Sequence, residues 1–284
     1  MSWRARYPFG SHWMPVEGGH RVHYVDEGAG PPVLMVHGNP TWSFYWRALI
    51  QDLAPDHRCV AIDHLGCGLS DKPEPGPYRL ADRVTHLVRL VEHLDLRALT
   101  LVVHDWGGAI GFGMAARVPD RVARVVVTNT GAFPFDRIPL RIAACRVPGL
   151  GPLAVRGFNG FAAAAITMAT ERGLAPDVRA GLLAPYDSWA HRVAVQAFVD
   201  DIPMSSRHPS WPALLESERG VAAMAGRPAL IAWGERDWCF TPAFRQEFER
   251  RLPGAEVERY ADAGHYVMED AVERIVPRIR RFLQ

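Results

Sequence analysis

Short apolar runs and helical patterns alternate along most of the chain. Apolar runs of strand length lie at 33–36, 59–62, 101–103, 122–127, 229–233 and 257–260. Apolar residues recur with helical spacing over 80–94, and helix-like runs cover 109–117 and 269–282. Strands that alternate with helices predict an α/β fold with a mostly parallel, doubly wound sheet.

Turn and capping residues predict one more helix near the end of the chain. Thr241 stands where an N-cap residue belongs, and Pro242 follows at the first helical position. Pro253 and Gly254 then mark where this helix ends. The helix falls between the last two predicted strands, as the alternating pattern requires.

The alternation fails between residues 133 and 215, which we call the cap segment. It is interrupted by Pro134, Pro139, Pro148, Pro152, Pro176, Pro185, Pro203, Pro209 and Pro212. We predict a helical cap inserted into a core of residues 1–132 and 216–284, over the carboxyl edge of the sheet, where α/β proteins bind ligands. Apolar stretches at 158–169 and 193–198 predict a largely apolar pocket between cap and sheet.

The composition is that of an ordinary globular chain. Of its 284 residues, 48% are hydrophobic and 22% are charged, and the formal net charge is +1. This balance gives no indication of a nucleic-acid or anionic-membrane partner. The longest apolar stretch, 158–169, is shorter than the roughly 20 residues of a membrane-spanning helix. We therefore expect no transmembrane segment and leave peripheral membrane contact open.

Cysteines and histidines give no metal-binding pattern. The four cysteines form no C-x-x-C pair, and the twelve histidines form no H-E-x-x-H motif or Cys/His cluster. We expect neither a metal nor a cofactor. The first 15 residues contain no apolar signal-peptide region, so a reducing cytoplasm is the expected compartment.

A candidate nucleophile follows the strand predicted at 101–103. A strand, a sharp turn and a helix form the nucleophile elbow of hydrolytic enzymes, and Asp105 stands at its nucleophile position. Gly107 and Gly108 let the following helix pass close to the strand. The serine form of this motif has glycine two residues before the nucleophile, where this chain has Val103. The alternative is a strand-end aspartate that caps the helix.

Two further candidates follow later strands. His265 lies between the last strand and the last helix, which is the place of the catalytic base in such folds. Asp237 follows the strand at 229–233, where a carboxylate can orient the imidazole and stabilise its protonated form. The alternatives are a loop histidine and a helix-capping aspartate ahead of Thr241. The order nucleophile, acid, base is the one that this fold uses.

Asn39 and Trp106 are the candidates for stabilising negative charge. The loop at 37–40 follows an early strand and is expected to donate one backbone N–H to an oxyanion hole, and the residue after the nucleophile donates the other. Both residues also carry side-chain N–H donors that could hold a halide or a developing carboxylate. The alternatives are a turn-forming asparagine and a core tryptophan.

A carboxylate nucleophile changes the expected chemistry. Aspartate is ionised at neutral pH and needs no base to activate it. It can displace a leaving group from carbon and form a covalent ester, which leaves His265 free to deprotonate water or transfer another proton. Suitable substrates are alkyl halides, epoxides and strained lactones.

Three segments resemble the haloalkane dehalogenase superfamily of α/β-hydrolases: 37–47 (HGNPTWSFYWR), 63–73 (DHLGCGLSDKP) and 102–108 (VVHDWGG). The resemblance covers nearly the whole chain. It implies the α/β-hydrolase fold with an inserted helical cap, and the triad Asp105, Asp237 and His265 with Asn39 and Trp106 on the leaving group. In one branch the acid follows an earlier strand, near Thr130, but no carboxylate occurs here before Asp136.

The segments 128–134, 184–189, 201–204 and 208–211 resemble the β-lactone decarboxylases of bacterial olefin biosynthesis, which were formerly labelled dehalogenases. This resemblance implies conversion of a small hydrophobic substrate, a long-chain cis-β-lactone, to a cis-alkene and CO2. It also leaves assembly with other olefin-pathway enzymes open.

Three other functions remain as alternatives. Haloalkane dehalogenase activity is the second hypothesis. An epoxide hydrolase is the third, because such enzymes usually have an aromatic residue where Asn39 stands and need cap tyrosines, of which Tyr186 is the prominent candidate. A non-enzymatic binding protein would be favoured if Asp105, Asp237 and His265 did not converge.

Overall fold

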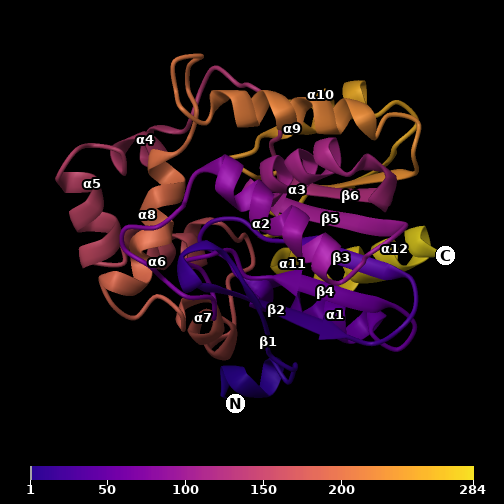
Figure 1. Cartoon of the computed structure of the whole chain (residues 1–284), viewed down its shortest axis with the longest axis horizontal. Helices are drawn as coiled ribbons and strands as arrows, with labels where there is room; N and C mark the ends of the chain where they lie inside the picture. The colour runs from indigo at the N-terminus through magenta and orange to yellow at the C-terminus, as the bar shows by residue number, and fades with distance from the viewer. Residues whose placement is uncertain (1) are drawn as a thin grey trace.

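A computed structural model of the chain describes residues 2–284 and is built around one eight-stranded sheet (Figure 1). The strands run in the order β1-β2-β4-β3-β5-β6-β7-β8. All neighbours pair in parallel except β2, which is antiparallel to both β1 and β4. The predicted mostly parallel sheet is confirmed. The strands are β1 (His12–Pro15), β2 (Arg21–Glu27), β3 (Pro32–Val36), β4 (Arg58–Ile62), β5 (Leu99–Asp105), β6 (Val122–Thr130), β7 (Ala229–Gly234) and β8 (Glu256–Tyr260).

The antiparallel pair β1 and β2 has no counterpart among the predicted strands. Four consecutive residues of β2, from Val22 to Val25, are buried, so apolar and polar positions do not alternate. One of the four is His23, whose Nδ1 donates to Asp63 at 2.8 Å. Because histidine counts as a polar residue, the buried and hydrogen-bonded His23 interrupts the apolar run by which this strand could have been predicted.

Helices cover both faces of the sheet, as a doubly wound fold requires. One face packs against α2 (Leu80–His93), α3 (Trp106–Arg117), α9 (Trp211–Ala223) and α10 (Pro242–Arg251). The other face packs against α1 (Arg47–Leu53), α11 (Val267–Asp270) and α12 (Val272–Leu283). The helix predicted over 269–282 is thus two helices, because Ala271 leaves the helical conformation. Thr241 holds the N-cap position of α10, but its side chain makes no capping hydrogen bond.

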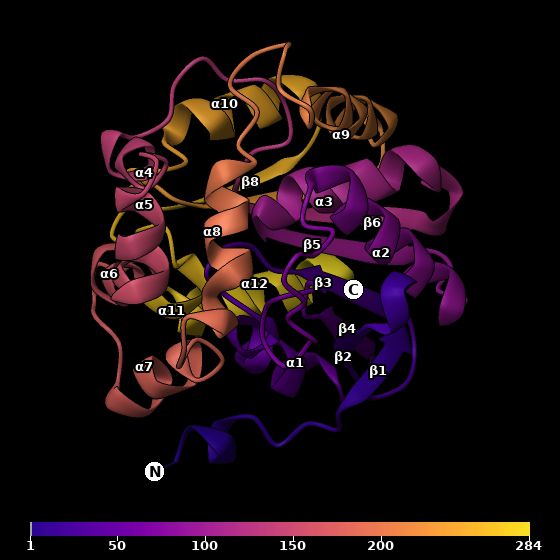
Figure 2. The same ribbon diagram turned by 60° about the vertical axis from the view of Figure 1, so that its left-hand side comes forward.

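The cap segment folds into short helices on one side of the sheet, away from the C-terminus (Figures 1 and 2). They are α4 (Leu140–Ala144), α5 (Leu150–Pro152), α6 (Gly160–Met168), α7 (Pro176–Leu183) and α8 (Val193–Asp200), with a π-helical turn at Leu153–Gly157 between α5 and α6. The cap segment contains no strand of the sheet, which explains why the sequence alternation fails there. Within residues 2–284, no helix is both long and apolar enough to cross a membrane.

Candidate active site

Strand β5 ends in a strained turn at Asp105. This residue has φ 53° and ψ −129°, a conformation that side-chain-bearing residues rarely adopt outside functional sites. The tight path of the next helix depends on glycine. A Cβ at position 107 would overlap the carbonyl oxygen of Val36, and one at position 108 would overlap the side chain of Thr130. The turn therefore projects Asp105 at the carboxyl end of the central strand.

The two carboxylate oxygens of Asp105 have different surroundings. Oδ1 accepts the backbone N–H of Asn39 at 2.5 Å, and the backbone N–H of Trp106 also bonds the carboxylate. Oδ2 lies 3.6 Å from Nε2 of His265. A Cβ at Gly38 would overlap this carboxylate, so glycine permits the close approach of the donor loop. Oδ1 is thus held by the Asn39 N–H, and Oδ2 faces His265.

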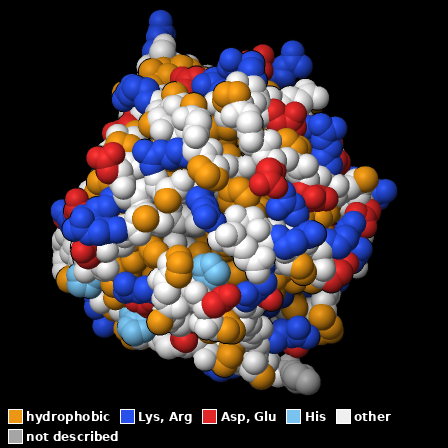
Figure 3. Space-filling model, turned by 90° about the vertical axis from the view of Figure 1, so that its right-hand side faces the viewer, with side chains coloured by type: hydrophobic (Ala, Val, Ile, Leu, Met, Phe, Trp, Pro, Cys, Tyr) orange, Lys and Arg blue, Asp and Glu red, His pale blue; other side chains and the backbone are white. Residues whose placement is uncertain are grey.

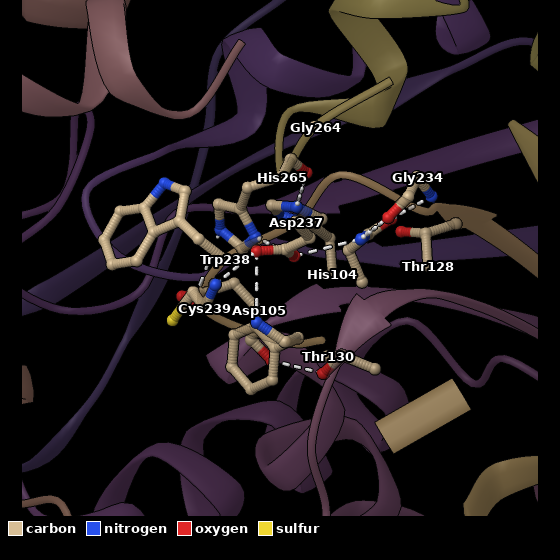
Figure 4. Close-up of polar contacts among 12 residues, drawn as sticks. His104, Asp105, Thr128, Thr130, Gly234, Asp237, Trp238, Cys239, Gly264 and His265 are labelled. Carbon is tan, nitrogen blue, oxygen red and sulfur yellow. Dashed lines mark hydrogen bonds and ion pairs between the residues drawn. The ribbon is translucent and has the colours of Figure 1, made fainter. Parts of the chain in front are cut away.

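His265 lies between two carboxylates (Figure 4). Its Nδ1 donates to Oδ2 of Asp237 at 2.8 Å, and its Nε2 faces Asp105. Oδ1 of Asp237 accepts the backbone N–H groups of Cys239 at 2.7 Å and of Phe240 at 3.1 Å. The predicted nucleophile, acid and base are therefore brought together from the ends of three different strands.

Asn129, at the end of β6, is a site residue that the sequence reasoning missed. Its side-chain amide donates to Oδ2 of Asp237 at 2.9 Å and to the carbonyl of Gly234 at 3.0 Å, and its carbonyl accepts the Gly234 N–H at 2.8 Å. The polar run Thr128-Asn129-Thr130 after an apolar strand was the available signal. Asp136, the alternative acid, has an almost fully exposed side chain that is 3.9 Å from Arg137.

His104 is a second residue whose role the sequence did not indicate. It is fully buried, and its Nε2 donates to the backbone carbonyl of His265 at 2.9 Å. Burial lowers the pKa of His104 well below that of a free imidazole, so the ring is neutral. His104 thereby holds the backbone of His265 from the end of β5.

The charges of Asp105 and His265 depend on each other. Burial raises the pKa of Asp105, while attraction to His265 and the two backbone N–H donors counteracts the rise. Burial alone would lower the pKa of His265, but Asp237 and Asp105 outweigh it and raise the pKa above its usual value. Each of the two side chains therefore shifts the ionisation of the other.

The side chains of Asn39 and Trp106 reach the same cavity as Asp105. The amide nitrogen of Asn39 donates to the backbone carbonyl of Val195 in α8 at 3.1 Å. Trp106 packs against Phe198, also in α8, with 5.3 Å between ring centroids. Helix α8 therefore braces both residues predicted to stabilise negative charge.

A cavity of about 730 Å³ lies between the cap segment and the strand ends. Asp105 and His265 line it together with mostly apolar side chains. The predicted stretch 158–169 contributes to its wall through Phe161, Ala164, Ala165 and Met168. The stretch 193–198 does not line it, so that part of the prediction is wrong. Its buried members, including Ala194 and Phe198, pack into the core beneath.

Comparison with known proteins agrees with this geometry. A family profile described as the alpha/beta hydrolase fold matches residues 31–149. A cis-3-alkyl-4-alkyloxetan-2-one decarboxylase of Xanthomonas campestris pv. campestris is 43% identical to this chain. The match covers 98% of this chain and 97% of the relative's length. A Shewanella oneidensis protein of the same name is 40% identical over 97% of this chain and 89% of its own.

Haloalkane dehalogenases are also similar, at lower identity. Haloalkane dehalogenase 2 of Mycobacterium tuberculosis is 36% identical over 96% of this chain and 94% of its own. The crystal structure of the haloalkane dehalogenase DbeA from Bradyrhizobium elkani superposes with a TM-score of 0.88, at 28% identity and 97% coverage of both chains. The relatives from both groups are enzymes, and the identity is higher to the decarboxylases.

Proposed function

Because the chain belongs to the α/β-hydrolase family of the cis-3-alkyl-4-alkyloxetan-2-one decarboxylases and the haloalkane dehalogenases, we propose that it is a β-lactone decarboxylase. Its substrate would be a long-chain cis-β-lactone, and its products a cis-alkene and CO2. We assign Asp105 as nucleophile, His265 as its charge partner and Asp237 as the acid that orients His265. Asn39 and Trp106 hold developing negative charge.

The unequal treatment of the two Asp105 oxygens carries this proposal. Oδ1 is held by the Asn39 N–H at 2.5 Å, whereas Oδ2 faces Nε2 of His265 at 3.6 Å. A carboxylate fixed in this way is poised to attack carbon and cannot rotate freely. The apolar cavity above it suits a substrate with alkyl chains.

The lactone reaction can be written without water. Attack of Asp105 Oδ2 on ring carbon C4 forms an ester and breaks the C4–O bond, which leaves a carboxylate attached to C3. Loss of CO2 then breaks the C2–C3 bond, and its electron pair forms the C3=C4 double bond. The C4–Oδ2 bond breaks in the same step and returns its electrons to Asp105. The Nε2 edge of His265 faces the reacting oxygen and would stabilise the carboxylate that ring opening releases.

Esterification of Asp105 would change His265. The ester removes one of the two negative charges that raise the pKa of His265, so the ring holds its proton less strongly, and in its neutral form it can accept a proton from water. In a dehalogenase this step completes hydrolysis to an alcohol. In the decarboxylase, loss of CO2 must be faster than water attack, which would instead give a β-hydroxy acid.

The products distinguish the two functions. Purified protein is supplied with a long-chain cis-β-lactone, and with 1-bromobutane and 1-iodobutane in parallel reactions. We expect cis-alkene by gas chromatography and slow or absent halide release. Rapid halide release with unchanged lactone would establish the dehalogenase instead. Conversion of the lactone to a β-hydroxy acid alone would show a lactone hydrolase.

The domain and cellular assignments are part of the same proposal. We propose that residues 133–215 act as a cap that covers the substrate and that 1–132 and 216–284 form the catalytic core. All four cysteines are free thiols, which suits a cytoplasmic location. Association with other olefin-pathway enzymes is tested by co-purification with a tagged form of this chain.

A further inference from the structure

The exposed apolar side chains of this protein are gathered on one part of its surface. Of nine large apolar residues that are exposed in residues 2–284, six belong to the cap segment. The most exposed are Leu140 at 87%, Phe158 at 77% and Leu150 at 68%. We call the six residues the cap patch: Leu140, Val147, Leu150, Leu153, Phe158 and Trp189.

The members of the cap patch lie on adjoining elements. Helices α4, α5 and α6 are neighbours at one side of the molecule in both ribbon views (Figures 1 and 2). Val147 accepts a backbone hydrogen bond from Gly151 at 2.7 Å, which joins the α4–α5 loop to α5. Leu153 and Trp189 both lie beside Gly157. These contacts place the patch residues on adjoining elements, and a globular protein rarely leaves so many large apolar side chains exposed in one region without a function.

The segment that carries five of the six patch residues is rich in arginine, and Glu74, Asp136 and Asp187 provide exposed carboxylates beside it. Residues 137–170 contain four arginines and no acidic residue. Arg156 is paired with Glu74 at 2.6 Å, whereas Arg137 has only the exposed Asp136 at 3.9 Å. Arg141 and Arg146 make no ion pair within the described part of the chain. The overall charge of +1 conceals this local excess. The face opposite the cap segment carries acidic and basic side chains side by side (Figure 3).

We propose that the cap patch binds the surface of an anionic lipid bilayer. Exposed apolar side chains next to arginines are the features with which peripheral proteins insert into the headgroup region of anionic membranes. Trp189, 47% exposed at the edge of the patch, has the amphipathic ring that favours this interface. A protein partner of matching shape would need acidic groups opposite the arginines, and the anionic bilayer supplies these over any area.

The cap patch adjoins the opening of the cavity. Arg137 and Arg141 line the cavity, and the side chain of Arg137 is 87% exposed, so the cavity reaches the surface beside Leu140. On the proposed function, a long-chain lactone or alkene could pass between the bilayer and the site without crossing water. Membrane binding itself rests on the patch and its charge, independently of that chemistry.

Co-sedimentation with vesicles tests the proposal without any substrate. We expect the protein to pellet with phosphatidylglycerol vesicles at 50 mM NaCl, and with at least about tenfold lower affinity at 500 mM NaCl, because salt screens the arginines. Binding to phosphatidylcholine vesicles should be weaker under both conditions. No pelleting with phosphatidylglycerol at low salt would overturn the proposal.

Matched variants locate the binding surface. The double variant Leu150→Glu/Phe158→Glu should lose at least about tenfold in vesicle affinity, and Arg146→Gln should lose less. Trp13→Glu is the control, because Trp13 is 43% exposed but lies on β1, away from the cap segment. Circular dichroism checks that each variant folds. Equal loss in the control variant would contradict the assignment to the cap patch.

Two other outcomes have defined meanings. Concentration-dependent dimers without lipid, lost in the double variant and accompanied by no vesicle binding, would make the patch a contact between copies and overturn the proposal. Normal vesicle binding with no alkene formation would support the membrane surface while rejecting the proposed reaction. The two proposals can therefore fail separately.

Discussion

Asn129 and Asp237 are joined by a hydrogen bond of 2.9 Å from the amide to the carboxylate oxygen that also faces His265. Asn129 lies near the end of β6, and Asp237 lies in the loop that follows the neighbouring strand β7. The amide therefore fixes the orientation of the Asp237 carboxylate from the adjacent strand. Two neighbouring strands thus contribute to holding the Asp237 side chain in place.

Replacing Asn129 by aspartate should move the pH dependence of turnover. Two carboxylates about 3 Å apart cannot both ionise freely, and any added negative charge raises the pKa of His265 further. In Asn129→Asp we expect kcat to fall about tenfold at pH 7. The limb of the pH–rate profile that reports His265 should shift to higher pH. An unchanged profile at full activity would show that Asn129 does not act through Asp237.

Asp105→Asn should lower kcat by a factor of at least about 10³ without destabilising the protein at neutral pH. Because burial raises the pKa of Asp105 above its unfolded value, ionisation of this carboxylate costs folding free energy as pH rises through the folded pKa. Asparagine keeps the shape and tolerates the positive φ, so the variant should gain melting temperature relative to wild type from pH 5 to pH 8. A variant much less stable at pH 8 would contradict this reasoning.

Asp237→Asn and Asp136→Asn separate the two candidate acids. Loss of the Asp237 charge removes the main interaction that raises the pKa of His265 and frees the ring to adopt the wrong tautomer, so kcat should fall about 10²- to 10⁴-fold. Asp136 is exposed and makes no contact with the site, so its variant should keep full activity. Steady-state kinetics on both proteins decides the assignment, and the reverse pattern would reject it.

Isotope labelling tests whether water takes part. Lactone turnover in H₂¹⁸O should leave the Asp105 carboxylate unlabelled, because the alkene forms with direct return of the electrons to Oδ2. Peptide mass spectrometry after many turnovers measures the label. Any slow haloalkane hydrolysis should label Asp105, which makes it an internal control. Labelling during lactone turnover would show hydrolysis at the Asp105 carbonyl carbon.

The sequence predicted those site residues whose position depends on a single preceding strand. Asp105, Asp237 and His265 each come directly after an apolar run, and parallel strands bring their carboxyl ends to one edge of the sheet. The nearby glycines also had a local signature, because the helix must pass close to the strand. The structure places these three side chains together from strand ends that are up to 160 residues apart along the chain.

Features that depend on neighbouring elements could not be predicted. Asn129 and His104 act only because β6 and β5 lie beside the loops that carry Asp237 and His265. Strand β2 was not predicted because its buried His23 interrupts the apolar pattern, and the hydrogen-bond partner of His23, Asp63, lies 40 residues later in the chain. The cap patch was missed because net charge averages over the surface, whereas its arginines and apolar residues are gathered in one segment.

The hydrogen bond from the Asn39 side chain to the carbonyl of Val195 joins the donor loop to the cap segment. A cap that lifts to release product must break this bond, and Asn39 then loses the contact that orients its amide. Product departure and loss of catalytic alignment would therefore occur at the same moment of each cycle. The enzyme would be competent only while the cap segment stays in contact with the donor loop.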